Sequence, residues 1–353
     1  MTQSNGNGIS PRVRSDLRMS DTTPIAGDDD AAPGQTKHAV SILIVAYNSA
    51  DLIAACLDSI PPACTQHGFE VLLVDNGDGS TEALVNRSHP WVRVIPSKGN
   101  VGFAAGNNWL AGHATSDRLL LLNPDMELEP GAIDALLAGA DAHPDAGAWG
   151  GVTVDARGRP DSGNAIAMPS LAEFASAAMG RSIVGNSRML GVDRDAEVDV
   201  LIGGFVMFDK AAWDAIGGFD ERFFLYCEEV DLYYRLEKIG YRFWRIAEAR
   251  GHHAIAHGQG LSPLRMLYRA AGTAEFVRRH WSMPASVLAR ALVWLAALER
   301  VAAGRLLGRW RPHLAAMANG YRDVALRPGH WWHGYDPKQG LLARLEQRQS
   351  GLG

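Results

Sequence analysis

The chain has 353 residues, of which 47% are hydrophobic and 21% charged, and its formal net charge is −5. This length suffices for one large domain, or for one domain with an appendage, and the mildly acidic balance argues against nucleic acid as a partner. The three cysteines, Cys56, Cys64 and Cys227, form no CxxC motif. They argue against a disulfide framework and favour a reducing, cytoplasmic compartment.

The first 37 residues are rich in Ser, Asp, Gly, Thr and Pro and contain no apolar stretch. We expect residues 1–37 to be a disordered leader without a signal peptide. The nearest approach to a membrane span is ALVWLAAL at 291–298, which is bounded by Arg290 and Glu299. A span needs a run of about 18 or more apolar residues, so we expect no helix to cross a bilayer.

Four apolar, β-rich runs follow one another in the first half, at 39–48, 69–77, 92–97 and 117–125, with helical patterns at 49–60 and 100–114. Near-continuous apolar strands that alternate with helices predict a Rossmann-like, mainly parallel sheet with helices on both faces. Each run ends in polar residues. Because ligands bind at the carboxyl ends of such strands, we expect these polar residues to converge on one rim of the sheet.

The pattern loosens after about residue 150. Residues 150–163 are typical of a hairpin or edge segment, and 197–223 predict a strand, a short helix from about Lys210 and a Gly-Gly turn. Residues 241–257 predict one or two further strands, and the chain becomes helical from about 262. This organisation predicts an α/β domain over 38–261 and a helical C-terminal extension over 262–353.

Three carboxylates, Glu228, Glu229 and Asp231, fall within four positions at the start of a predicted helix. The positive end of the helix dipole tolerates one or two such acids, which is the structural explanation. The functional explanation is a general base, because repulsion among the three would raise at least one pKa toward a useful range. Arg235 lies four residues after Asp231 and is interpreted as helix support without a catalytic role.

The chain resembles glycosyltransferase family 2, the inverting enzymes of GT-A fold, and within it the rhamnosyltransferase-like branch. Six stretches carry the resemblance in the family's order: SILIVAYNSADLIAACLDSI, VLLVDNGDGSTE, NVGFAAGNNWL, LLLLNPDMELEPGAI, GGFVMFDKAAWDAIGGFDERFFLYCEEVDLYYRLEKIGYR and HHAIAHGQGLS. The resemblance implies a metal-dependent transferase in cell-envelope or exopolysaccharide synthesis. Rhamnose from dTDP-rhamnose is the expected donor, UDP-linked sugars stay open, and the implied acceptor is a glycan or a polyprenyl-linked sugar.

By this resemblance, nucleotide-sugar binding falls to Ala46, Tyr47, Asn48, Asp75, Asn100, Gly102, Asn107 and Asn123. An aspartate at a strand end can accept hydrogen bonds from a base or a sugar, and glycine lets a ligand approach the backbone. Local structure offers an alternative for each position. The stretch after Asp75 is rich in turn residues, Asn48 could cap a helix, and the segment around Gly102 could be only a helix start.

The resemblance also implies a divalent cation, Mg²⁺ or Mn²⁺, bound by Asp125 and His257. Asn123-Pro124-Asp125 occupies the family's D-x-D position without the first acid. One carboxylate is sufficient in principle because such cations take one or two carboxylates plus phosphate oxygens. His252 and His253 are rivals of His257, and an Asn-Pro turn with a capping aspartate is the structural alternative.

Inversion requires a base that removes the acceptor proton while the hydroxyl attacks the anomeric carbon. The family places this base at the position of Glu229, although aspartate is more usual there, and Asp231 is the second candidate. Glu228 and Gly204 are expected to bind the acceptor, with a tight turn as the alternative role of Gly204. The departures from the family pattern leave an alternative open, a catalytically inactive nucleotide-sugar-binding scaffold of a polysaccharide complex. No GxGxxG follows the first strand, which disfavours a dehydrogenase.

Between residues 285 and 313 the chain carries five arginines and one acid, and the arginines fall within about half the circumference of one helix. With Trp294 and Trp310, this pattern predicts peripheral contact with the inner face of the cell membrane. A helical appendage packed on the main domain is the alternative. HWWHGYDP at 330–337 is interpreted as an acceptor-side lid or a packing patch, and a homo-oligomer stays open.

Overall fold

The computed structural model describes residues 38–154, 165–180, 193–253 and 262–349. Within them the strands are β1 (Val40–Ala46), β2 (Phe69–Asp75), β3 (Arg93–Val94), β4 (Arg118–Leu122), β5 (Met126–Leu128), β6 (Ala146–Val154), β7 (Ala165–Ile166), β8 (Ala196–Glu197), β9 (Val200–Leu201), β10 (Phe205–Asp209) and β11 (Arg242–His253). The helices are α1 (Ile53–Ala63), α2 (Ser80–Ser88), α3 (Gly102–Ala111), α4 (Ala132–Ala142), α5 (Leu171–Ala178), α6 (Lys210–Ala215), α7 (Glu228–Lys238), α8 (Pro263–His280), α9 (Met283–Leu307), α10 (Pro312–Leu326), the 3-10 helix η1 (Pro328–His330) and α11 (Leu341–Gln349).

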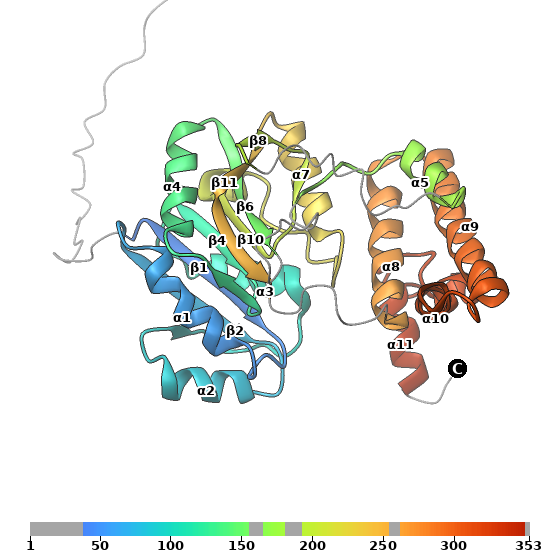
Figure 1. Cartoon of the computed structure of the whole chain (residues 1–353), viewed down its shortest axis with the longest axis horizontal. Helices are drawn as coiled ribbons and strands as arrows, with labels where there is room; N and C mark the ends of the chain where they lie inside the picture. The colour runs from blue at the N-terminus through green and yellow to red at the C-terminus, as the bar shows by residue number, and fades with distance from the viewer. Residues whose placement is uncertain (1–37, 155–164, 181–192, 254–261, 350–353) are drawn as a thin grey trace, which may run out of the picture. The chain divides into compact units, whose positions relative to one another are not determined.

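A nine-stranded sheet runs in the order β3-β2-β1-β4-β10-β6-β11-β5, with β8 paired to β11 (Figure 1). The four strands predicted in the first half are parallel, and β1 pairs with β2 in continuous register from Val40–Phe69 to Ala46–Asp75. Parallel strands place their carboxyl ends together, so the predicted rim of polar residues is confirmed.

Both faces of the sheet are covered because successive side chains of each strand point to opposite faces. Ile42 and Ile44 of β1 enter a core shared with α1 and α4, whereas Leu43 enters a second core shared with α3, α7 and α8. The expected two-sided α/β sheet is therefore confirmed.

The expectation of a hairpin or edge segment over 150–163 is wrong for residues 150–154, the part of that range that lies within the described residues. These residues belong to β6, which lies inside the sheet between β10 and β11. The glycines that suggested a turn give room to neighbouring side chains. A Cβ on Gly150 would lie 2.6 Å from Leu201 Cδ2, and a Cβ on Gly151 would lie 2.1 Å from Phe205 Cε1.

The C-terminal helices α8, α9, α10 and α11 pack on one another (Figure 1). The expected single basic helix over 285–313 is wrong, because α9 ends at Leu307 and α10 begins at Pro312. Arg290 and Arg300 are also buried and donate to the carbonyl oxygens of Trp332 and Ala296. The arginines thus form no continuous exposed stripe. Across the described helices, none has the length and hydropathy of a bilayer span.

Candidate active site

Asp75, the last residue of β2, is 2% exposed and accepts two backbone hydrogen bonds. Its Oδ1 accepts from Gly77 N at 2.8 Å and its Oδ2 from Glu82 N at 3.1 Å. The carboxylate therefore shapes the loop that enters α2. This is the turn-forming role that the sequence left open beside nucleotide binding.

The neighbouring Asn76, which the sequence reading passed over, joins two of the predicted ligand-binding segments. Its Nδ2 donates to Gly102 O at 3.1 Å, so it ties the end of β2 to the start of α3. Its Oδ1 is buried and finds no hydrogen-bond partner within the described residues. An acceptor without a partner at the sheet rim suits a ligand N–H. The available signal was the second polar residue at the strand end.

Tyr47 and Asn48 follow β1 beside this loop. Tyr47 is 57% exposed, so its ring is accessible to a ligand. Asn48 has a left-handed backbone with φ 51°, and a Cβ on Gly77 would lie 2.8 Å from its Oδ1. The Ala46 side chain is fully buried, and its carbonyl oxygen accepts from Asn76 N at 2.8 Å. Only the backbone of Ala46 therefore contributes to the rim.

The start of α3 lies close to the segment that leads into the acid-bearing helix α7. Gly102 has φ +86°, and a Cβ there would lie 2.5 Å from Phe224 O, so the position needs glycine. Asn100 is exposed, and its Oδ1 accepts from Gly102 N at 3.3 Å. Asn107 is 1% exposed and donates to Phe103 O at 3.0 Å. It is placed to brace α3, away from an exposed ligand surface.

Asn123 and Asp125 lie in the turn between β4 and β5. Asn123 N donates to Gly204 O at 3.0 Å, which ties this turn to the start of β10. The Asp125 carboxylate is 16% exposed, and its Oδ2 lies 3.0 Å from His253 Nε2. The sequence named His253 only as a rival of His257, which lies outside the described residues. His252 pairs instead with Glu129 at 3.2 Å.

Glu229, in the first turn of α7, is partly exposed and faces the start of β10. Its Oε1 accepts from Gly203 N at 3.2 Å, and the next residue, Gly204, pairs with Asn123. Two backbone contacts therefore link the Glu229 carboxylate to the turn that holds Asp125. Burial raises the pKa of Glu229 above its ordinary value.

Glu228 is 2% exposed, and its Oε2 has no hydrogen-bond partner within the described ranges. Burial and the charge of Glu229 raise the pKa of Glu228 well above its ordinary value. A buried carboxyl without a cation beside it is stable in its neutral form. Glu228 therefore holds a proton more firmly than an ordinary carboxyl, next to the partly exposed Glu229.

Asp231 is in contact with two basic side chains. It is fully buried; its Oδ2 accepts from Arg235 Nε at 2.7 Å, and its Oδ1 lies 2.6 Å from His280 Nε2 of α8. Arg235 also donates to the carbonyl oxygens of the Gly-Gly turn region. With both oxygens engaged, Asp231 is suited to fixing α7 against α8 and poorly suited to receive a proton from an acceptor.

The turn before α7 is strained and tightly enclosed. Tyr226 and Cys227 both have left-handed backbones, with φ 68° and 69°, which is costly for residues other than glycine. Gly272 of α8 lies against this turn, since a Cβ there would be 2.2 Å from Tyr226 O. The Tyr335 hydroxyl donates to Leu225 O. Helix α8 and the segment after η1 thus hold the backbone that leads into Glu228 and Glu229.

Comparison with known proteins identifies the family and the fold of the chain. Residues 41–217 match the family Glycosyl transferase family 2, and residues 190–257 match the N-terminal domain of galactosyltransferase. A solved structure of GalNAc-T7 with UDP, GalNAc and Mn²⁺ superposes with a TM-score of 0.51 at 13% identity, over 85% of this chain and 59% of that one. The fold is the GT-A glycosyltransferase fold, and the protein is a glycosyltransferase.

The chain belongs to glycosyltransferase family 2. It is 32% identical over 245 residues to an N-acetylglucosaminyl-diphospho-decaprenol L-rhamnosyltransferase of Mycobacterium tuberculosis, covering 63% of this chain and 78% of that protein. It is 24% identical over 235 residues to the rhamnosyltransferase WbbL of Escherichia coli, covering 62% of this chain and 84% of that protein. The family and the rhamnosyltransferase-like resemblance expected from the sequence are therefore confirmed.

Proposed function

We propose that the protein is a metal-dependent inverting glycosyltransferase that moves rhamnose from dTDP-rhamnose to a lipid-linked acceptor in cell-envelope or exopolysaccharide synthesis. The observation that carries this proposal is the position of Glu229. Its carboxylate is held by Gly203, one residue from the Gly204–Asn123 pair and hence beside the turn of Asp125. A proposed base and a proposed metal ligand thus border the same part of the sheet rim.

The donor nucleotide is assigned to the rim formed by the ends of β1 and β2. Tyr47 offers an exposed ring for stacking, and Asn76 Oδ1 offers an acceptor without a partner in the described structure. The N3–H of a thymine or uracil is a donor of the kind that Asn76 lacks. Asp75, Asn100 and Asn123 stay in the proposal as further polar groups of this rim.

The residues at the β4–β5 turn fit a divalent cation. Asp125 Oδ2 and His253 Nε2 lie 3.0 Å apart, a separation that lets both ligate one ion. No cluster of three or more potential protein ligands occurs within the described ranges, which is compatible with an ion whose other ligands are phosphate oxygens and water. When bound, the cation would stabilise the charge that develops on the leaving diphosphate. The solved GalNAc-T7 structure holds Mn²⁺, and an imidazole ligand would favour Mn²⁺ over Mg²⁺.

Glu229 is proposed to take the proton of the acceptor hydroxyl as that oxygen attacks the anomeric carbon. Attack from the side opposite the leaving diphosphate inverts the configuration of that carbon. A raised pKa makes a carboxylate a stronger base, and burial provides that shift. Glu228 and Gly204 border the same region and are proposed to contact the acceptor, while Asp231 is proposed to fix the helix rather than to serve as the base.

The acceptor is proposed to be a lipid-linked sugar reached from the inner face of the cell membrane. The M. tuberculosis relative is named for a decaprenyl-diphosphate-linked acceptor. Exposed apolar side chains gather along α9 and its connection to α10, namely Met283, Val287, Leu288, Leu295, Leu306, Leu307 and Trp310. Such a surface is suited to lie on a bilayer.

The test is nucleotide release by the full-length protein from a panel of dTDP-rhamnose, UDP-glucose and UDP-galactose, with Mn²⁺ or Mg²⁺ and an N-acetylglucosaminyl-diphospho-lipid acceptor. We expect release of dTDP and a product that is one deoxyhexose heavier by mass spectrometry. Turnover of a UDP-sugar alone would replace rhamnose in the proposal. Failure to use any donor would refute the enzymatic assignment.

A further inference from the structure

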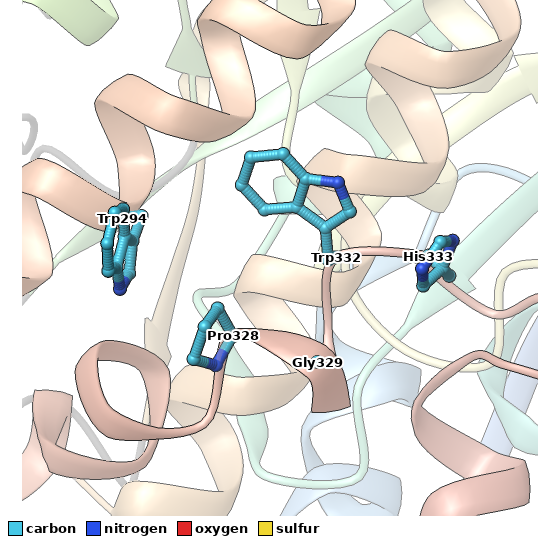
Figure 2. Close-up of a pocket in the computed structure, with 5 residues that line it drawn as sticks. All are labelled: Trp294, Pro328, Gly329, Trp332 and His333. Carbon is cyan, nitrogen blue, oxygen red and sulfur yellow. The ribbon is translucent and has the colours of Figure 1, made fainter.

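A groove on the C-terminal helices is lined by Trp294, Pro328, Gly329, Trp332 and His333 and has a volume of about 300 Å³. Figure 2 shows Trp294 on one side, Pro328 and Trp332 in the middle, and His333 on the side opposite Trp294. Its walls are almost wholly apolar. It lies outside the residues that the proposed chemistry uses.

Two hydrogen bonds to backbone carbonyl oxygens fix the walls of this groove. Trp294 Nε1 donates to Ala325 O at 2.8 Å, so the polar edge of that indole is satisfied. Arg290 donates to Trp332 O at 2.9 Å, and its guanidinium carbon lies 4.8 Å from the centre of the Trp332 ring. The aromatic faces are thus held in place for an apolar ligand.

One end of the groove is basic. Arg278 donates to His333 O, and Arg290 contacts the adjacent Trp332. Burial, followed by the charges of Arg278 and Arg290, lowers the pKa of His333, and Arg344 acts in the same direction. Asp336 opposes them, and Glu275 lies 3.6 Å from Arg278. Three guanidinium groups therefore outnumber two carboxylates at the His333 end.

We propose that this groove binds the polyprenyl diphosphate part of the acceptor, with the first isoprene units between the two tryptophans and the diphosphate near Arg278 and Arg344. An apolar slot with a cationic end is complementary to a ligand that is apolar along its chain and anionic at its head. The inference rests on the proposed function, since it names where that acceptor's lipid is held.

The groove is joined to the base-bearing helix by a short piece of chain. The segment that supplies Trp332 and His333 continues to Tyr335, whose hydroxyl donates to Leu225 O three residues before Glu228. Tyr335 N also donates to Glu275 of α8 at 3.0 Å. A lipid head held at His333 would therefore lie on the same segment that supports α7, as an acceptor subsite requires.

The direct experiment is calorimetric titration of the full-length protein with farnesyl diphosphate, a soluble ligand that carries both chemical features. We expect saturable binding that Trp332→Ala weakens at least tenfold. Arg344→Gln should weaken binding of farnesyl diphosphate but leave binding of farnesol within twofold. Trp91→Ala, at an exposed tryptophan, and Arg322→Gln, at an exposed arginine, are matched controls that should leave both affinities unchanged.

Equal affinities in wild type and the Trp332 and Arg344 variants, or no binding of farnesyl diphosphate, would overturn the inference. A third result would also overturn it: wild type and variants bind farnesyl diphosphate equally, but Trp332→Ala no longer binds neutral phosphatidylcholine vesicles. The groove would then be a contact with the bilayer. Loss of concentration-dependent self-association in Trp332→Ala without an effect on lipid would assign it to a second copy instead.

Transfer kinetics separate this inference from the proposed function. If both hold, Trp332→Ala raises KM at least tenfold for a long-chain acceptor and leaves KM for a short alkyl acceptor and kcat unchanged. Farnesyl diphosphate binding without any sugar transfer would refute the proposed function alone. Transfer with the same long-chain KM in wild type and Trp332→Ala would refute the lipid site alone.

Discussion

Substitution of Gly272 by alanine tests whether α8 sets the position of Glu228 and of the proposed base Glu229. The new Cβ would lie 2.2 Å from Tyr226 O and 2.9 Å from Tyr226 C. Ordinary C···O contacts are about 3.3 Å or longer, so the backbone must separate by about 1 Å. The displaced residues lead directly into Glu228 and Glu229, and a misplacement of about 1 Å can cost about 100-fold in rate.

The variant should therefore lose about 10- to 100-fold in kcat, while its dissociation constant for the donor stays within twofold of wild type. Its free energy of unfolding should change little, because two opposing effects partly cancel. Overpacking costs about 1–3 kcal/mol, and replacing a helical glycine by alanine returns up to about 1 kcal/mol. Steady-state kinetics, calorimetric donor binding and urea unfolding provide the three measurements.

Gly112→Ala is the matched control, since a Cβ there would meet its nearest atom at 3.6 Å, and we expect wild-type kcat. Tyr335→Phe is a milder variant that removes only the hydroxyl bound to Leu225 O. It should lower kcat, as Gly272→Ala does but by less, and it should shift the acidic limb of the pH–rate profile. A kcat within twofold of wild type in both variants would show that this turn does not position the acids.

Three further outcomes follow from side chains around the site. Glu228→Gln should make the protein more stable than wild type as pH rises above 4.5. The folded-state pKa of Glu228 is raised above 4.5, so its protonation contributes stability that is fully present below 4.5. Wild type loses this stability as pH rises through the folded-state pKa, whereas the glutamine variant does not. Asp231→Asn should lower the free energy of unfolding by about 3 kcal/mol. Loss of the buried carboxylate leaves its basic partners, Arg235 and His280, without their counter-charge. His253→Ala should raise the Mn²⁺ concentration needed for half-maximal activity at least tenfold and reduce the preference for Mn²⁺ over Mg²⁺.

Matched variants give each of these measurements a reference. Asp78→Asn removes an exposed carboxylate whose pKa is lowered by its hydrogen bonds to Ser80, and it should show no such stabilisation at higher pH. An unchanged pH–stability profile for Glu228→Gln would mean that Glu228 is not held neutral. Asp214→Asn, in an exposed pair with Lys210, should cost less than about 1 kcal/mol, and an equal cost for Asp231→Asn would contradict its structural role. Equal metal requirements for His253→Ala and wild type would remove His253 from the ion site.

The first half of the fold was predictable because its signals are local. Each strand is a continuous apolar run that ends in polar residues, and a parallel arrangement then gathers those ends by geometry alone. Tyr47 and Asp75 consequently lie at one rim, as expected. The alternation of Ile42, Leu43 and Ile44 between two cores shows why such a run needs helices on both faces.

The remainder depends on contacts between residues that are distant in the chain. The glycines of β6 suggested a turn, whereas they make room for Leu201 and Phe205, more than 45 residues away in the chain. Helical periodicity placed the five arginines of the C-terminal segment on one side of a helix and so suggested an exposed stripe. Periodicity does not show which of them find tertiary partners. Arg290 finds one 42 residues away in Trp332.

In the candidate site too, some features have local sequence signals and others depend on distant contacts. A cluster of acids at a helix start was visible in the sequence, but the sequence could not tell which acid is free. The structure distinguishes them by partners. Asp231 is engaged by Arg235 and His280, Glu228 is buried, and Glu229 faces Gly203. The support from Gly272 has no local signature at all.

The central claim is that Glu229 removes the acceptor proton, and a Glu229→Gln variant measures this most directly. General-base catalysis contributes about 10²- to 10⁴-fold, so kcat for transfer should fall by at least about 100-fold. The donor dissociation constant should stay within twofold, and Glu237→Gln, at the exposed end of the same helix, should retain wild-type activity. A Glu229→Gln enzyme that transfers sugar at more than a tenth of the wild-type rate would contradict the account.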